Sequence, residues 1–138
     1  MSFVIDGQFV QSDKYSTTEI FDQAIDQLES FDAQNDDRPF YLHIAPFTPH
    51  RPFDPEPQYA NASVPAWDVP PSVGEADRTD KPNFVSFTNV TQEESADVRR
   101  QQLRMLMSVD DQMEKLIDRL TALGEADNTV FILSLIHI

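Results

Sequence analysis

The spacing of apolar residues changes along the chain, and each spacing predicts a different element. Short apolar runs over residues 3–10 flank Asp6-Gly7, a dipeptide that readily takes the positive φ angles of a tight turn, which predicts a small β-hairpin. A helical spacing then predicts a helix over about residues 17–31, preceded by a capping-box pattern at residues 16–19. The apolar face of this helix consists of Phe21, Ala24, Ile25 and Leu28.

A longer helical spacing occupies the second half of the chain. It begins after a second capping-box pattern, Thr91-Gln92-Glu93-Glu94. Gly124 stands where a left-handed C-terminal cap belongs, so we expect the helix to end there. The apolar positions of this helix are Val98, Leu103, Leu106, Met107, Met113, Leu116, Ile117, Leu120 and Leu123.

Two apolar runs are too short for helices and predict buried strands. They are "FYLHIAP" at residues 40–46 and "NTVFIL" at residues 128–133. Uniformly apolar strands are typical of parallel sheets that helices cover on both faces. Between Pro46 and about Val90 the chain is rich in proline and has no sustained period. This order of elements predicts an α/β fold with parallel strands, flanking helices and a long Pro-rich loop.

Composition narrows the classes of partner. The chain of 138 residues has 24 acidic and 10 basic residues, which gives a net charge of -14. An electrostatic field of that sign repels nucleic acid and anionic lipid surfaces, so we expect neither as a partner. There is no cysteine, which excludes disulfides and a cysteine nucleophile within these residues.

His50 is the candidate functional residue, because it follows the first predicted strand directly. Ligands of open parallel sheets bind beyond the carboxyl ends of the strands. Pro49 and Pro52 restrict the backbone around His50, so the loop can hold an imidazole with little loss of entropy. A charged imidazole could contact an oxyanion, and a neutral one could transfer a proton. The alternative is that His50 only caps a strand and binds a backbone carbonyl.

Other polar residues carry weaker functional hypotheses. We expect His43 to be a structural residue of the buried strand, and the spacing of His43, His50 and Asp54 matches no established metal site. Arg51 could bind an anion or pair with an acidic side chain, and both options stay open.

Two acidic pairs and one proline-rich stretch are the remaining candidates for a function. We expect Asp36-Asp37 and Asp110-Asp111 to be solvated charges, since neighbouring residues on a helix point about 100° apart. The stretch "PHRPFDPEP" could dock into an aromatic groove as a polyproline segment, although the strand before it favours an ordered active-site loop.

Three segments resemble the sulfatase family. "RPFYLHIAPFTPHRPF" is similar to its strand of the form PFFLYLAP and the loop PHxPF that follows. "LRMLMSVDDQMEKLIDRLTALGEADNTVFIL" is similar to the family's VDD helix and next strand, and "YSTTEIFDQAIDQL" to the helix before the first strand. The three lie in the family's order between Tyr15 and Leu133 and are most similar to enzymes of sulfated sugars, such as N-acetylglucosamine-6-sulfatases.

The resemblance implies an alkaline-phosphatase-like α/β fold and hydrolysis of sulfate esters. It also implies a formylglycine nucleophile, made from the first residue of a C/S-x-P-x-R motif, and a calcium ion that holds the sulfate oxygens. The histidine of the PHxP loop contacts the sulfate or protonates the leaving alcohol. His50 is the only position that inherits a family role.

The sequence also departs from the family pattern. It contains no C/S-x-P-x-R motif and no paired aspartates near its start, and "SLIHI" stands where the family has T/S-D-N-G. We therefore expect residues 1–134 to be part of a sulfatase catalytic domain and residues 135–138 to be a non-native tail. We expect calcium in the parent enzyme, and no metal and no turnover in this chain alone.

Two rival functions stay open, together with the details of the reaction. One is a phosphate-ester hydrolase of the same superfamily, and the other is a non-enzymatic acidic module that binds a partner through the Pro-rich loop. The expected substrate is a sulfated carbohydrate, but the residues do not identify the sugar or the sulfate position. Family habit suggests the periplasm, the lysosome or the outside of the cell.

Overall fold

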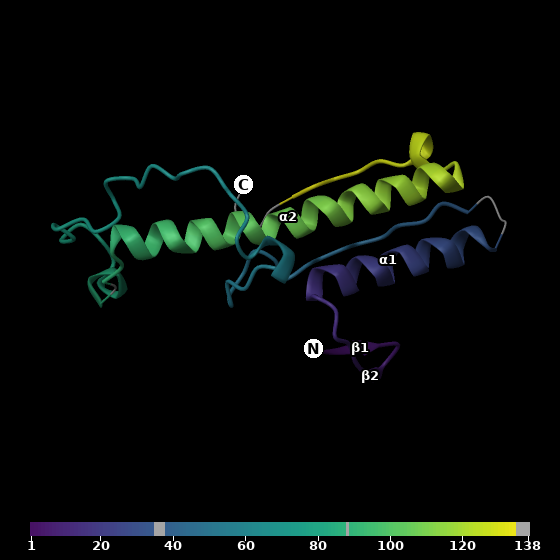
Figure 1. Cartoon of the computed structure of the whole chain (residues 1–138), viewed down its shortest axis with the longest axis horizontal. Helices are drawn as coiled ribbons and strands as arrows, with labels where there is room; N and C mark the ends of the chain where they lie inside the picture. Colours follow the sequence, from purple (N-terminus) through teal and green to yellow (C-terminus); the bar gives the residue numbers. More distant parts are fainter. Residues whose placement is uncertain (35–37, 88, 135–138) are drawn as a thin grey trace. The chain divides into compact units, whose positions relative to one another are not determined.

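The computed structural model describes residues 1–34, 38–87 and 89–134, and the chain divides into two compact units. The first unit consists of Met1–Pro46 and Asp110–Ile138, and the second consists of Phe47–Val109. Figure 1 labels the helices and strands. The predicted tail at residues 135–138 and the Asp36-Asp37 pair lie outside the described residues.

The predicted hairpin is confirmed at the start of the first unit. Strand β1 (Ser2–Ile5) pairs antiparallel with strand β2 (Gln8–Gln11). The turn between them places Asp6 at φ 49° and Gly7 at φ 76°, the left-handed conformation that a two-residue hairpin turn requires. The sequence signal was strong because few dipeptides accept that conformation twice in a row.

Helix α1 (Ser16–Asp32) forms where the apolar spacing predicted it, but the capping box at its start is not formed. The N-cap residue is Tyr15, which provides no side-chain capping bond. The carboxylate of Glu19 instead accepts hydrogen bonds from Ser12 Oγ at 2.7 Å and Gln23 Nε2 at 3.0 Å. Glu19 thereby ties the helix to the segment that leads out of the hairpin.

Helix α2 (Gln92–Leu123) begins with the predicted capping box. Thr91 N donates to Glu94 Oε2 at 2.8 Å, and Glu94 N donates to Thr91 Oγ1 at 3.1 Å. The hydrogen bonds from the backbone and side chain of Thr91 lower the pKa of the Glu94 carboxyl. In the part of the chain that the structure describes, no helix is both long and apolar enough to span a membrane.

The C-terminal end of α2 also agrees with the prediction. Gly124 takes φ 78°, Gly124 N donates to Thr121 O at 3.1 Å, and Glu125 N donates to Leu120 O at 2.9 Å. These two bonds form a Schellman motif, which satisfies backbone carbonyls that the helix itself leaves without partners.

The core of the first unit lies between α1 and the C-terminal part of α2. Phe21, Leu28, Leu116 and Leu120 form its buried cluster. Phe40, Leu42 and Ile44 from an extended segment pack against this cluster, as do Ile25, Phe31, Met113 and Ala126. Figure 1 shows the extended segment running along α1. The Phe31 and Phe40 rings stack with their centroids 6.1 Å apart.

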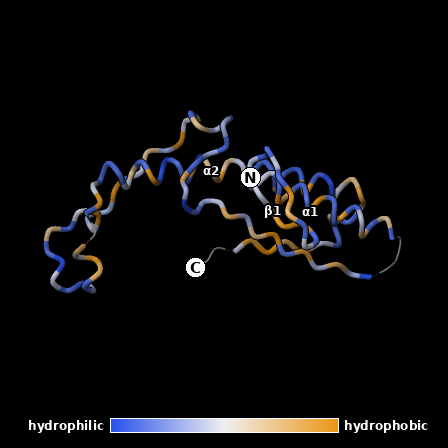
Figure 2. Tube along the Cα trace, turned by 90° about the horizontal axis from the view of Figure 1, so that it is seen from below, coloured by the Kyte–Doolittle hydropathy of each residue, from blue (hydrophilic) through white to orange (hydrophobic). Residues whose placement is uncertain are grey.

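The two predicted parallel strands are not formed in this structure. Residues 40–46 and 128–133 include extended backbone, but within the described residues β1 and β2 make the only sheet, and it is antiparallel. A strand needs a hydrogen-bonded neighbour, and the described residues offer none to either segment. Figure 2 shows the second segment as a hydrophobic stretch leading to the C-terminal end, where Val130 and Ile132 are 83% and 87% exposed.

The core of the first unit covers only one face of residues 40–46. Phe40, Leu42 and Ile44 are half-buried, whereas Tyr41 and His43 are exposed. Successive side chains of extended backbone point to opposite faces, so the helices cover every second residue. The prediction that His43 is a core residue is therefore wrong for this structure, because His43 lies on the uncovered face.

The second unit is mostly irregular. Its loop between Pro46 and Thr91 contains two short 3-10 helices, η1 (Pro57–Tyr59) and η2 (Asn83–Phe87). The first part of α2, up to Val109, belongs to the same unit and provides its long regular element.

Candidate functional site

His50 lies on an exposed turn of the second unit. Its backbone N–H donates to Phe47 O at 2.9 Å, which closes the turn. The His50 and Phe47 rings contact each other, with centroids 5.0 Å apart and planes inclined by 55°. The Thr48-Pro49 peptide bond is cis, as is Arg51-Pro52. The imidazole is therefore placed by a closed turn and an aromatic neighbour, and it is open to solvent.

The ring nitrogens of His50 have different surroundings. Nδ1 lies 3.4 Å from the carbonyl oxygen of Arg51. When Nδ1 donates a hydrogen bond to this carbonyl, Nε2 of the neutral ring is a hydrogen-bond acceptor. In the charged ring Nε2 carries a proton and is a hydrogen-bond donor. This arrangement suits either contact with an oxyanion or proton transfer to an oxygen of a ligand.

Arg51 contacts an aromatic neighbour, and both of its predicted alternatives stay open. Its guanidinium lies 5.6 Å from the centroid of the Phe53 ring, a cation–π contact that holds it beside the loop. The guanidinium of Arg51 therefore lies against the Phe53 ring of the same loop.

Three polar side chains of α2 fasten the loop around His50. Gln102 Nε2 donates to Pro49 O at 3.5 Å, and Arg104 Nε donates to Ala62 O at 3.0 Å. Ser108 Oγ, which is fully buried, donates to Glu56 Oε2 at 2.8 Å. The loop over residues 49–62 is thus attached to the helix on both sides of η1. We call Gln102, Arg104 and Ser108 the loop anchors.

We expect Ser108→Ala to destabilise the second unit by about 1–3 kcal/mol, because the half-buried carboxylate of Glu56 loses the hydrogen bond from the buried Ser108 hydroxyl. Hydrogen exchange of the backbone amides in residues 47–62 measures the effect, and faster exchange there is the expected result. Ser63→Ala, which alters an exposed serine of the same unit, is the matched control and should change stability by less than about 0.5 kcal/mol. Equal exchange rates in both variants would show that the anchor does not hold the loop.

The other candidates do not join His50 in a common site. His43 belongs to the first unit, and His50 and Asp54 belong to the second. Among residues 1–34, 38–87 and 89–134 no three metal-binding side chains converge, so we derive no chemical step through a metal ion. Asp110 is exposed and Asp111 is half-buried, so only the first of this pair has the solvation that we predicted.

The sequence reasoning did not find the loop anchors. Their signal was present, because Arg104 and Ser108 are polar residues within the apolar run that includes Leu103, Leu106 and Met107. A polar residue inside an apolar helix face is a candidate for a specific buried hydrogen bond.

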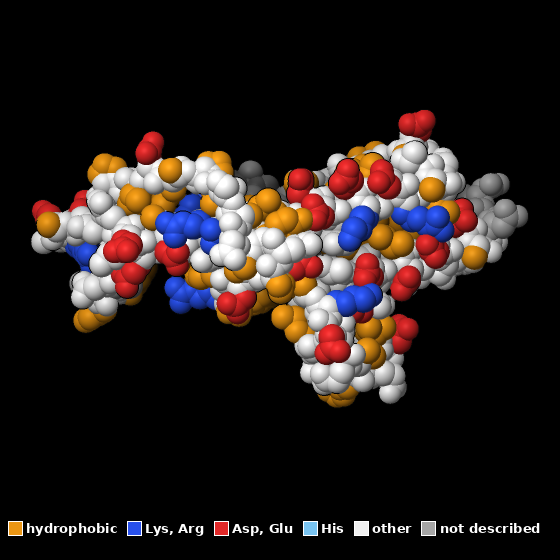
Figure 3. Space-filling view, in the orientation of Figure 1, with side chains coloured by type: hydrophobic (Ala, Val, Ile, Leu, Met, Phe, Trp, Pro, Cys, Tyr) orange, Lys and Arg blue, Asp and Glu red, His pale blue; other side chains and the backbone are white. Residues whose placement is uncertain are grey.

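Acidic side chains spread over the surface of the chain. Figure 3 shows Asp and Glu scattered over the face in view, with basic side chains in a few places. The net charge of -14 makes any local group of basic residues a notable site for an anion.

Comparison with known proteins gives one family and one curated relative. Residues 4–134 match the family model described as sulfatase. An arylsulfatase from Volvox carteri is 29% identical over 146 residues, an alignment that covers 87% of this chain and 22% of the relative. The chain thus spans about a fifth of the length of that relative. No solved structure matches the chain.

Proposed function

The chain belongs to the sulfatase family, and from this premise we propose that it is part of a sulfuric ester hydrolase in which His50 contacts the sulfate group of the substrate. The observation that supports the assignment to His50 is its placement: an exposed imidazole on a turn whose Pro49 carbonyl accepts a hydrogen bond from Gln102 of α2. Family membership implies the alkaline-phosphatase-like α/β fold, of which these residues form a part.

The reaction converts R–O–SO₃⁻ and water into the alcohol R–OH and hydrogen sulfate. As the S–O bond to the leaving group breaks, negative charge develops on the alcohol oxygen. A charged His50 can donate a hydrogen bond to a sulfate oxygen, or it can give its Nε2 proton to the leaving oxygen. Both roles need the imidazole to be held before the substrate arrives, and the closed turn, the Phe47 ring and the Gln102 contact to Pro49 supply that support.

The nucleophile and the metal that the family resemblance implies have no matching motif in residues 1–138. A formylglycine would supply the attacking oxygen, and calcium would neutralise the sulfate. We propose that both belong to parts of the complete enzyme other than the described residues, and no step is assigned to them here.

The two extended segments support the proposal that this chain completes a larger sheet. Tyr41 is 86% exposed and Ile132 is 87% exposed, although both belong to apolar runs. In the complete domain we propose that residues 40–46 and 128–133 pair as parallel strands, which would cover these side chains. His50 would then lie beyond the carboxyl end of the first strand, where ligands of such sheets bind. The same exposure disfavours an independent acidic binding module.

For the substrate we propose a sulfated carbohydrate. The support is the resemblance of the ordered segments between Tyr15 and Leu133 to enzymes of sulfated sugars. N-acetylglucosamine 6-sulfate is the first sugar to test.

The test is hydrolysis by the complete, matured enzyme. We expect kcat/KM for 4-nitrophenyl sulfate to exceed that for 4-nitrophenyl phosphate by roughly a hundredfold or more, and N-acetylglucosamine 6-sulfate to release sulfate. Both esters release 4-nitrophenol, so the ratio of their kcat/KM values measures the preference of the enzyme for sulfate over phosphate. A phosphate preference would overturn the assignment.

A further inference from the structure

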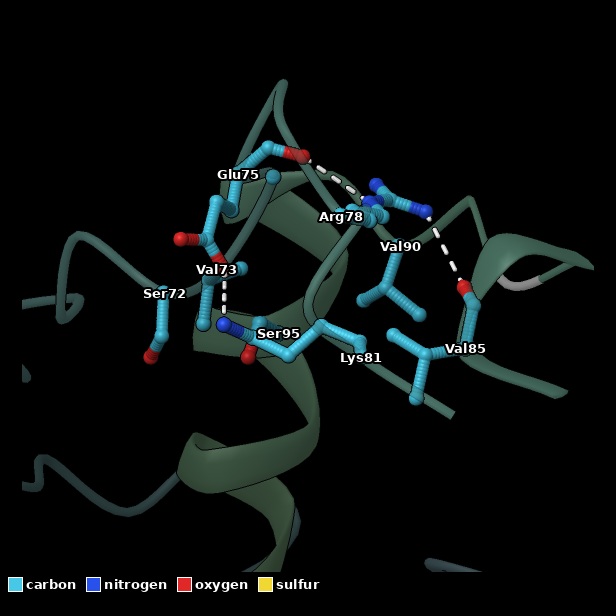
Figure 4. Close-up of a pocket in the computed structure, with 9 residues that line it drawn as sticks. Ser72, Val73, Glu75, Arg78, Lys81, Val85, Val90 and Ser95 are labelled. Atoms are coloured by element: carbon cyan, nitrogen blue, oxygen red, sulfur yellow. Dashed lines mark hydrogen bonds and ion pairs between the residues drawn. The ribbon is translucent and has the colours of Figure 1, made fainter. Parts of the chain in front are cut away.

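The second unit contains an open cavity at which basic side chains gather. Its volume is about 240 Å³, and it lies between the loop over residues 72–90 and the first turn of α2 (Figure 4). Arg78 and Lys81 line it, two of the 10 basic residues in a chain that has 24 acidic ones. Glu75 lines it too, so two basic side chains face one acidic one, and the lining repels anions less than the rest of the chain does.

Arg78 is held in place before any ligand binds. Its Nε donates to Glu75 O at 2.8 Å, and its Nη1 donates to Val85 O at 3.2 Å. Figure 4 shows the guanidinium spanning these two parts of the loop. A planar cation fixed by two backbone carbonyls loses little entropy when an anion approaches it.

Lys81 is held by carboxylates that a ligand can replace. Its Nζ lies 3.3 Å from Glu75 Oε2 and 2.8 Å from Asp80 Oδ2. Hydrogen bonds to Asp80 and then to Glu75 raise the pKa of Lys81, so its ammonium stays charged at neutral pH. Exposed ion pairs of this kind contribute little stability, so an anion with better geometry can take the place of Glu75.

The rest of the lining is not purely ionic. Val73, Val85 and Val90 form apolar walls, and the hydroxyls of Ser72 and Ser95 lie at the cavity (Figure 4). A bare inorganic ion would use the charges and hydroxyls but leave the valines without contact. An anionic group carried on a carbon ring would use all three kinds of lining.

We propose that this cavity binds a second anionic group of the substrate, a sulfate or carboxylate carried on a sugar ring, through Arg78 and Lys81. The proposal rests on the proposed function, since it extends the sulfated carbohydrate to one with more than one anionic group. Glu75 competes with that group for Lys81. The cavity thus gives the enzyme a preference for polyanionic substrates over esters with a single charge.

The test compares two substrates of the complete enzyme in the Lys81→Met variant. We expect KM for a disulfated disaccharide to rise about tenfold in this variant, because a charged hydrogen bond is lost. KM for 4-nitrophenyl sulfate should stay within about twofold, as should kcat for each of the two substrates. Glu75→Gln should lower KM for the disulfated substrate only. A uronate-containing monosulfated disaccharide separates a carboxylate ligand from a sulfate ligand. Lys14→Met is the matched control, because Lys14 also pairs with a carboxylate, Asp22 at 2.6 Å, but in the first unit.

The outcomes separate the two proposals. Equal changes in KM for both substrates, or none, would overturn the cavity proposal while hydrolysis of the aryl sulfate upholds the proposed function. If the enzyme does not hydrolyse sulfate esters, titration of the 138-residue chain with glucosamine 6-sulfate decides the cavity on its own. Saturable NMR shifts of the Val73, Val85 and Val90 methyl groups, lost in Lys81→Met, are expected, and unchanged spectra would overturn it.

Discussion

His50→Ala in the complete enzyme is expected to lower kcat/KM for a sulfate ester by roughly a hundredfold or more. In the proposed function the imidazole donates to the sulfate or to the leaving oxygen, and alanine removes it. The substitution leaves the turn intact, because the backbone bond from His50 N to Phe47 O does not use the side chain. Steady-state kinetics with N-acetylglucosamine 6-sulfate measures the effect, and the thermal unfolding temperature should match that of the unaltered enzyme.

The leaving group distinguishes the two possible roles of His50. If the imidazole protonates the leaving oxygen, the loss should be larger for a sugar alcohol than for 4-nitrophenol, whose oxygen needs little protonation. If it only contacts the sulfate, the two losses should be equal. Ser63→Ala, which alters an exposed residue of the same unit outside the His50 turn, is the control and should retain activity. Full activity in His50→Ala would return His50 to the structural class.

Phe21→Ala should cost about 3–5 kcal/mol of the free energy of unfolding of the chain. Phe21 is 2% exposed and packs with Leu28, Leu116 and Leu120, so its removal leaves a cavity between the two helices. Domains are typically stable by only about 5–15 kcal/mol, and a chain with so small a buried cluster lies at the lower end. We therefore expect Phe21→Ala to remove most of the cooperative unfolding transition.

Urea unfolding followed by circular dichroism measures this change. Phe84→Ala is the matched control, because Phe84 is 71% exposed and its truncation should alter stability by less than about 0.5 kcal/mol. A cost below about 1 kcal/mol for Phe21→Ala would mean that α1 and the end of α2 do not pack in solution as they do here.

The sequence predicted correctly those elements that depend on a few neighbouring residues, namely the hairpin turn and the two ends of α2. Asp6-Gly7 predicted the hairpin turn because the backbone conformation there depends on two residues alone. The capping box at Thr91 and Glu94 and the cap at Gly124 were predicted for the same reason. The predicted capping box at Ser16 did not form, because Ser16 is the first residue of the helix and Tyr15 is its N-cap. The Glu19 carboxylate accepts a hydrogen bond from Ser12 instead.

Elements that need distant partners were predicted less well. The apolar composition of residues 40–46 predicted a strand buried on both faces, but pairing depends on a neighbouring strand, and the described residues provide none. The position of His50 after that run could be read from the sequence, and its role remains a prediction. The cavity at Arg78 and Lys81 could not be predicted, because its lining comes from loop residues whose contacts have no periodic signal.

The uncovered faces of residues 40–46 and 128–133 have a practical consequence for work with the isolated chain. Extended apolar backbone without a neighbour is a template on which further chains can add as cross-β layers. The net charge of -14 opposes such stacking at low ionic strength, and added salt removes that protection by screening. Dilute, low-salt buffers are therefore the conditions under which we expect this chain of 138 residues to stay as single molecules.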